Sequence, residues 1–171
     1  MMMVALGVGI VLGWATGGSL THLAKIRFYL WEGLIGVLVL QLMLQRYPAT
    51  PLALWLFILS YIVMLGILGV NWKTPGVSLI ASGVGLNALV IVLNRGMPVD
   101  GTALPADQLT RLSGGHYPFY HLVGEDTVLP VLADHIFVPF EFLGAGSLLS
   151  PGDFALMIGI VWLIVVGMRP T

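Results

Sequence analysis

The chain has 171 residues, of which 58% are hydrophobic and 9% are charged, and its 7 basic and 8 acidic residues give a formal net charge of −1. An average soluble domain is about a quarter charged, so this composition excludes a soluble globular protein. The near-neutral charge argues against nucleic acid as a partner, and the absence of cysteine excludes disulfides and thiolate sites. The composition predicts a polytopic helical membrane protein, because lipid solvates apolar surface of this extent.

Five apolar runs are long enough to cross a bilayer, whose hydrocarbon core of about 30 Å needs roughly 20 helical residues. Charged or proline-containing segments separate them, and Ser150-Pro151-Gly152-Asp153 opens the last run with residues typical of a helix N-terminus. We therefore expect an all-α fold and a single transmembrane domain over residues 1–171, with a loop over residues 94–150. The predicted spans are residues 3–20, 28–44, 52–70, 76–93 and 151–168.

The distribution of basic residues predicts the orientation in the membrane. With five spans the termini lie on opposite sides, and the short segments on one side carry four basic residues, whereas the other side carries three in longer and more acidic segments. The positive-inside rule then places the N-terminus and the long loop outside and the C-terminus in the cytoplasm. The four are Lys25, Arg27, Lys73 and Arg169, and the three are Arg46, Arg95 and Arg111.

Small residues at helical spacing mark two of the predicted spans. Such residues let two helix backbones approach closely inside a membrane. We expect the first and fourth spans to form a close pair within the bundle, with a homodimer seam as the alternative. Gln41 and Asn87 are uncharged polar residues in apolar runs and are expected to hydrogen-bond between helices. The small residues are Gly9, Gly13 and Gly17 in the first span and Ser78, Ser82 and Gly85 in the fourth.

The loop over residues 94–150 contains most of the polar chemistry. A cluster of tyrosines and histidines predicts an aromatic belt at the membrane interface. A divalent metal site is the alternative, although the spacing lacks the helical HExxH pattern. Its candidate ligands are His116, His121, Glu125 and Asp126.

Residues 128–143 are again mostly apolar, but two prolines and Asp134 interrupt them. These residues disfavour a full span, and a re-entrant or interfacial element is expected. Asp134 either caps a short helix or pairs with Arg95 or Arg111, or it acts with His135 as a general base or ligand.

Three motifs, taken in order, resemble a family of small bacterial multi-span integral membrane proteins of unknown function. They are Asn94-Arg95-Gly96-Met97-Pro98-Val99, Leu132-Ala133-Asp134-His135-Ile136 and Ser150-Pro151-Gly152-Asp153. The resemblance implies a multi-pass protein of the bacterial cell membrane and no particular reaction. It directs attention to a candidate functional cap made of Asn94, Gly96, Pro98, Asp134, Ser150, Gly152 and Asp153.

These observations favour a non-enzymatic binding or accessory module with an outward-facing cap and no cofactor. Its expected partners are the lipid bilayer and a membrane protein or a second copy of the chain. The alternative is a membrane-embedded enzyme acting on a lipid-linked substrate through Asp134 and His116 or His121. A small-solute permease is less favoured, because the spans carry no series of charged residues.

Overall fold

The computed structural model describes residues 2–47, 50–138 and 147–170. In these ranges the chain is mostly helical and also contains four short strands. The helices are α1 (Met2–Ala15), α2 (Leu20–Leu23), α3 (Trp31–Leu44), α4 (Pro51–Val70), α5 (Val77–Asn94), α6 (Ala106–Ser113) and α7 (Pro151–Gly167), with the 3-10 turns η1 (Gly101–Ala103) and η2 (Pro130–Leu132). The strands are β1 (Met97–Val99), β2 (Tyr120–Leu122), β3 (Ile136–Val138) and β4 (Ser147–Leu149).

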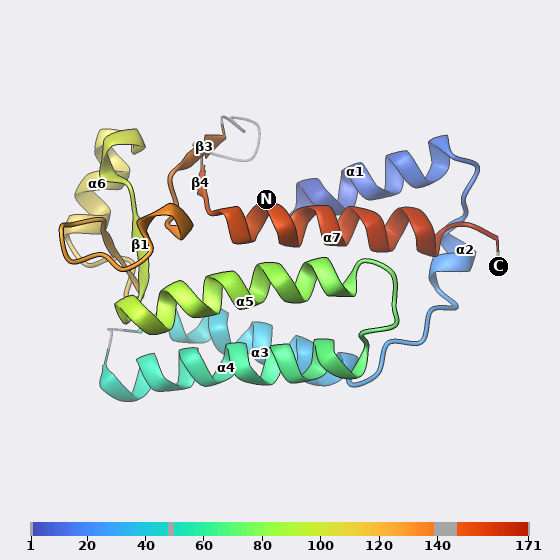
Figure 1. Ribbon diagram of the computed structural model, residues 1–171, viewed down its shortest axis with the longest axis horizontal. Coiled ribbons are helices and arrows are strands. Elements are labelled where there is room, and N and C mark those ends of the chain that lie inside the picture. The colour runs from blue at the N-terminus through green and yellow to red at the C-terminus, as the bar shows by residue number, and fades with distance from the viewer. Residues whose placement is uncertain (1, 48–49, 139–146, 171) are drawn as a thin grey trace.

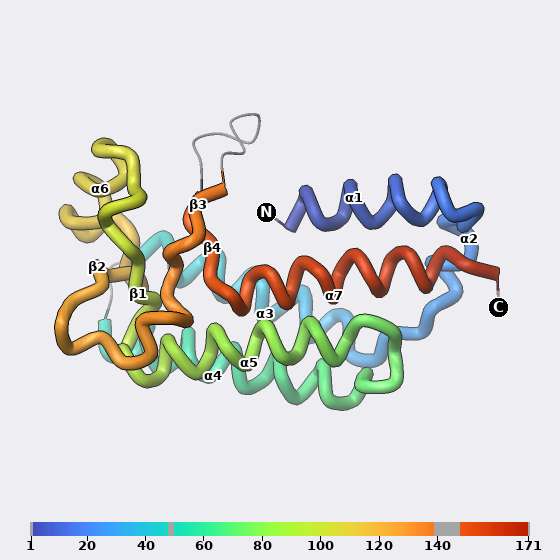
Figure 2. The backbone as a smooth tube through the Cα atoms, turned by 45° about the horizontal axis from the view of Figure 1, so that its top comes forward, coloured from blue at the N-terminus to red at the C-terminus, as the bar shows by residue number. Residues whose placement is uncertain are grey.

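Five apolar helices lie side by side along the long axis (Figure 1). α5 and α7 pack along each other in the centre, α1 packs on α7, and α4 packs on α5 with α3 beside it. Figure 2 shows the polar segment between α5 and α7 gathered at one end, with the C-terminus at the other. From here on, the cap means this segment, residues 95–138 and 147–150. The seven residues of the candidate functional cap lie in it or at the adjoining ends of α5 and α7.

Two helices, α4 with 20 residues and α5 with 18, are long and apolar enough to cross a bilayer. α1 and α3 have 14 residues each and α7 has 17, so helix length does not support the prediction of five full spans. α1 and α3 are shorter than the apolar runs predicted as the first and second spans. Backbone turns and tertiary contacts limit these helices, and neither can be recognised from hydropathy.

Two residues with a left-handed backbone conformation limit the lengths of α1 and α3. Gly17, with a φ of 79°, follows the end of α1, and Leu30, with a φ of 59°, precedes α3. Asn71 at the end of α4 accepts a hydrogen bond from the Tyr29 nitrogen at 2.7 Å and donates one to the Tyr29 oxygen at 2.8 Å. These contacts hold the residues before Trp31 outside the helix.

Glycines allow the close approach of α5 and α7. A Cβ atom at Gly83 would lie 2.7 Å from the Leu156 nitrogen, and one at Gly76 would lie 2.7 Å from the Leu163 nitrogen. Gly159 faces the Ile80 nitrogen at the same distance. Because these neighbours are backbone atoms, any larger residue would push the two helices apart.

The small residues predicted to pair the first and fourth spans have other neighbours. Gly9 faces Ile164 of α7, Gly13 faces Met168 directly after α7, and a Cβ atom at Gly17 would meet no neighbour within 4 Å. On α5, the Ser82 hydroxyl donates to the Ser78 oxygen at 2.9 Å, and Gly85 approaches only Leu65 of α4. α1 thus pairs with α7, because a small-residue stripe permits close packing without specifying the partner.

The described chain is mostly helical, as the sequence predicts, and the cap adds four strands of three residues each. β1 pairs in parallel with β2, and β3 pairs antiparallel with β4. Over residues 128–138, part of the segment predicted to be re-entrant or interfacial, the chain forms η2 and β3, because Pro130 starts a tight turn and Ile136 and Val138 favour a strand. The remainder of the predicted element, residues 139–143, lies outside the described residues.

A stacked pair of rings joins the cap to the helices. Phe119 of the cap and Phe57 of α4 lie 4.4 Å apart between ring centroids with an interplanar angle of 8°, and both are buried. Val90 and Ile91 of α5 and Met97 of the cap belong to the same buried cluster. The cap is therefore held on the end of the bundle by an apolar core that it shares with α4 and α5.

Candidate functional site

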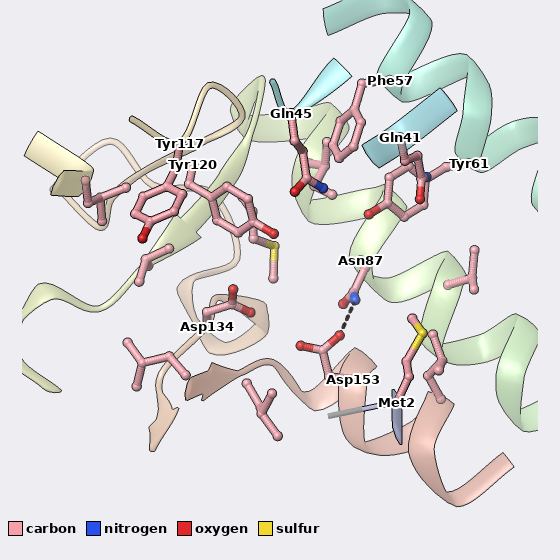
Figure 3. Close-up of a pocket in the computed structure, with 18 of the residues that line it drawn as sticks. Met2, Gln41, Gln45, Phe57, Tyr61, Asn87, Tyr117, Tyr120, Asp134 and Asp153 are labelled. Carbon is pink, nitrogen blue, oxygen red and sulfur yellow. Dashed lines mark hydrogen bonds between the residues drawn. The ribbon is translucent and has the colours of Figure 1, made fainter. Parts of the chain in front are cut away.

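A cavity of about 510 Å³ lies where the cap meets the helices (Figure 3). Residues of α1, α3, α4, α5, α7 and the cap form its wall, and most of them are apolar. The polar members are Gln41, Gln45, Tyr61, Asn87, Gln108, Tyr117, Tyr120, Asp134 and Asp153.

The structure brings the first two motifs together through their backbones. The Asp134 nitrogen donates to the Pro98 oxygen at 2.9 Å, and the Asp100 nitrogen donates to the Asp134 oxygen at 2.9 Å. Asp134 thereby pairs in parallel with Val99 of β1, on the edge of β1 opposite to β2. These bonds fix the carboxyl group of Asp134 at the cavity wall.

Asn94 and Gly96 support this arrangement from outside the cavity. The Asn94 amide accepts from the Val128 nitrogen at 2.8 Å and donates to the Val128 oxygen at 2.9 Å, which anchors the segment that leads through η2 to Asp134. A Cβ atom at Gly96 would lie 3.0 Å from the Phe119 oxygen, so a larger residue would crowd β2. Both residues position the cap and neither lines the cavity.

Asp134 is the most unusual group of the site. It is 8% exposed, and its Oδ1 atom has no hydrogen-bond partner within the described ranges. Burial raises the pKa of this carboxyl group to about 8, and the charge of nearby Asp153 adds to the effect. An unpaired buried carboxylate is costly, so the group is mainly protonated at neutral pH while the cavity is empty.

The two pairing partners expected for Asp134 are not used. Neither Arg95 nor Arg111 forms an ion pair with it in the described part of the chain, and Asp134 does not begin a helix. His135 turns away from it, with its Nδ1 atom 2.8 Å from the Ala133 oxygen. The reason is the backbone pairing with β1, which directs the carboxyl group inward.

Asp153, in contrast, is fully engaged at the start of α7. Its Oδ2 atom accepts from the Ser150 nitrogen at 3.1 Å, and the Ser150 hydroxyl accepts from the Asp153 nitrogen at 3.0 Å. This is the capping box that the third motif predicted. The second oxygen, Oδ1, accepts from the Asn87 amide at 2.9 Å (Figure 3).

Asn87 links α5 to this helix start. Besides donating to Asp153, its Oδ1 atom accepts from the Ser150 hydroxyl at 2.8 Å. A Cβ atom at Gly152 would lie 2.8 Å from the Asn87 Cγ atom, so glycine leaves the space for the amide. Ser150, Gly152 and Asp153 therefore hold the helix end in place, while only Asp153 lines the cavity.

Further polar groups of the wall come from positions that the sequence did not single out as a site. Gln41 of α3 donates to the Ser60 hydroxyl of α4 at 2.8 Å, as an interhelical bond between apolar runs predicts. Tyr120 of β2 is partly buried, and loss of water contact together with the charges of Asp134 and Asp153 raises its pKa. Tyr61 carried no signal in the sequence, and Tyr120 was noted only as part of the predicted aromatic belt, because the neighbours of both come from distant segments.

The candidate metal ligands do not gather at the cavity. Within residues 2–47, 50–138 and 147–170, no group of three His, Asp or Glu side chains is arranged to hold a metal ion. His116, His121, Glu125 and Asp126 all lie outside the cavity wall. His121 is partly buried, which lowers its pKa.

Comparison with known proteins gives one match. A family model described as a family of unknown function (DUF5317) matches residues 24–165, about four-fifths of the chain. No curated protein and no solved structure matches it. The expected relation to a family of unknown function is thereby confirmed at this level.

Proposed function

Because the chain belongs to the DUF5317 family of unknown function, we propose from its geometry that it is a multi-span protein of the bacterial cell membrane that binds a small ligand beneath its outward-facing cap. It acts as a non-enzymatic binding or accessory module. The observation that carries this proposal is the unpartnered, buried Asp134 oxygen at the wall of a cavity of about 510 Å³.

The surface of the helices supports a location in the membrane. All five tryptophans are between 53% and 66% exposed, and many leucine, isoleucine and valine side chains are exposed along α1, α3 and α4. Soluble monomers rarely expose contiguous apolar patches of this kind, whereas lipid solvates them. Trp14, Trp31 and Trp72 also lie at the helix ends far from the cap, as expected for residues at a membrane interface.

All five apolar helices cross the membrane in this proposal. α1 and α3 are each about 21 Å long and α7 about 26 Å, at 1.5 Å per residue. They lie alongside the longer α4 and α5 (Figure 1). A bilayer adapts to short apolar helices by local thinning, and flanking residues reach to the interface.

The proposed orientation places the cap outside and the C-terminus in the cytoplasm. The connections at the end of the bundle far from the cap carry Lys25, Arg27 and Lys73, and Arg169 follows α7 at the same end. Cytoplasmic segments of membrane proteins carry such an excess of basic residues. The exposed apolar faces then contact the bilayer and, for an accessory module, a membrane-protein partner or a second copy.

A binding role has more support than the enzyme alternative. That alternative needs Asp134 and a histidine at one site, yet no histidine is among the described residues that line the cavity. A small-solute permease has the least support, because the charged residues of the five apolar helices are Glu32 and Asp153, each in the first turn of its helix, and they form no series along the bundle.

Native mass spectrometry tests the proposal. The full chain, extracted from its own membranes in a mild detergent and incubated with a small-molecule and lipid extract of the same cells, is expected to retain one defined small molecule. Asp134→Asn is expected to reduce its occupancy roughly tenfold or more, because the amide replaces one of the two carboxyl oxygens at which the ligand bonds.

Asp107→Asn is the matched control, since this acid lies on the exposed surface of α6. It is expected to bind as the unchanged chain does. An unchanged chain that retains nothing, or an Asp134→Asn chain with full occupancy, contradicts ligand binding at Asp134. Release of a chemically altered lipid by the purified protein contradicts the non-enzymatic role.

A further inference from the structure

The cavity wall restricts the charge of any ligand. Of the described residues that line it, Asp134 and Asp153 are acidic and none is Lys, Arg or His. The remaining polar groups are the amides and phenols named above, all of which can accept hydrogen bonds. A negatively charged ligand would therefore meet two carboxyl groups and no positive side chain on this wall.

Within this pair, Asp134 is the group available to a ligand. Both Asp153 oxygens already accept hydrogen bonds, from Asn87 and from the Ser150 nitrogen. The Oδ1 atom of Asp134 is buried without a partner in the described ranges, on a side chain that is more than nine-tenths buried. A positive charge placed against this oxygen pairs with the ionised carboxylate and offsets the cost of ionising it.

Aromatic rings complete the polar end of the cavity. Figure 3 shows Tyr117, Tyr120 and Asp134 on the cap side and Gln41, Tyr61 and Asn87 on the helix side of the space. Phe57 lines the same wall and lies edge-to-face with Tyr61, with 5.4 Å between the ring centroids. Aromatic rings attract a desolvated cation, so the rings and Asp134 both favour a positively charged group on the ligand.

About one helical turn farther from the cap than these polar helix residues, the cavity wall is apolar. Met2 of α1, Leu38 of α3 and Met64 of α4 line it, together with Val84 and Leu156. A ligand that filled this part with polar groups would leave them without hydrogen bonds. The wall therefore fits a molecule with a charged end at the cap and an apolar body between the helices.

We propose that the cavity binds an amphiphilic organic ammonium ion, whose charged nitrogen pairs with Asp134 among the aromatic rings and whose apolar part lies between α1, α3 and α4. This inference rests on the proposed function and specifies its ligand. Binding replaces the proton of Asp134 with the cation, and the proton passes to solvent. An ammonium-bearing phospholipid shares this chemistry, but its phosphate would find no basic residue on the described wall.

Isothermal titration calorimetry of the full chain in a neutral detergent tests this inference. The probe is phenethyltrimethylammonium, and its control is the uncharged carbon analogue 3,3-dimethylbutylbenzene, which has the same shape. We expect the cation to bind at least about tenfold more tightly than the analogue. Asp134→Asn is expected to remove most of this preference, whereas Asp107→Asn leaves it unchanged.

The pH dependence of the unchanged chain provides a second readout that needs no variant. The probe keeps its charge at every pH, whereas Asp134 ionises near pH 8. Because only the ionised carboxylate pairs with the cation, affinity is expected to rise roughly tenfold or more from pH 6 to pH 8. The titratable groups around Asp134 are Asp153 of α7, Tyr61 of α4, Tyr120 of β2 and His135, the next residue in the chain.

Equal affinity for the charged and uncharged probes, or a cation affinity that does not change with pH, overturns the ammonium inference. If native mass spectrometry still shows a ligand that depends on Asp134, the binding site stands and its ligand is uncharged. If no ligand is retained there either, the proposed function fails as well. Competition by phosphatidylethanolamine in nanodiscs assigns the ammonium to a lipid headgroup, and its absence assigns it to a free amine.

Discussion

Gly83→Val is expected to lower the free energy of unfolding by about 3 kcal/mol, because the new side chain has no space between α5 and α7. A Cβ atom at this position would lie 2.7 Å from the Leu156 nitrogen and 2.9 Å from the Leu156 Cβ atom. The Gly152 oxygen is also in contact with this position, and neither backbone group moves without separating the helices. Thermal unfolding in a mild detergent, followed by tryptophan fluorescence, is expected to show a midpoint roughly 10 °C lower.

Gly85→Ala in the same helix is the matched control. A Cβ atom there meets only the Leu65 Cδ2 atom at 4.0 Å, which is an ordinary contact. The alanine is expected to leave the midpoint unchanged or to raise it slightly, because alanine favours the helix more than glycine does. Similar midpoints for Gly83→Val and the unchanged chain would show that α5 and α7 do not pack through Gly83.

Asp153→Ala is expected to lower the free energy of unfolding by about 2 to 4 kcal/mol. The change removes the acceptors for the Ser150 nitrogen and the Asn87 amide, both at the buried start of α7. It also removes a negative charge from the positive end of the helix dipole. The same thermal unfolding measurement checks this value.

Asp153→Asn separates the loss of hydrogen bonds from the loss of side-chain volume. Asparagine keeps one acceptor oxygen and nearly the same size, so its effect is expected to be about half that of alanine. If Asp153→Ala unfolds at the same temperature as the unchanged chain, the hydrogen-bonded link between α5 and α7 contributes nothing to stability.

Local chemistry explains which parts of the structure the sequence could predict. The start of α7 was predicted because Ser150 and Asp153 bond to each other's backbone, three residues apart. Thr50 and Pro51 begin α4 in the same way, with the Thr50 hydroxyl accepting from the Ala53 nitrogen. Such contacts depend only on neighbours in the chain, so the pattern is visible without the fold.

The parts that could not be predicted depend on distant segments. The strands of the cap have three residues each, too few for an alternating pattern to appear. Asp134 faces the cavity because its backbone pairs with Pro98 and Asp100, more than 30 positions earlier. Its sequence context alone left a helix cap, an ion pair and a catalytic role open.

The choice of helix partners was hidden for a similar reason. Gly9 and Gly13 indicated close packing, and the structure shows their partner to be α7 and not α5. The glycines that bring α5 and α7 together include Gly76, which lies just before the helix, and Gly159 in the middle of α7. Spacing along one helix shows which face is small, while the facing helix is fixed by the whole bundle.

Single-cysteine labelling tests most directly the central claim that the apolar helices cross the membrane with the cap outside. The natural chain has no cysteine, so Asp107→Cys in α6 and Lys73→Cys between α4 and α5 each add a single reactive site. With a membrane-impermeant maleimide, Asp107→Cys is expected to be labelled in intact cells and Lys73→Cys only after the membrane is opened. Labelling of both positions in intact cells, or of Lys73→Cys alone, would contradict the claim.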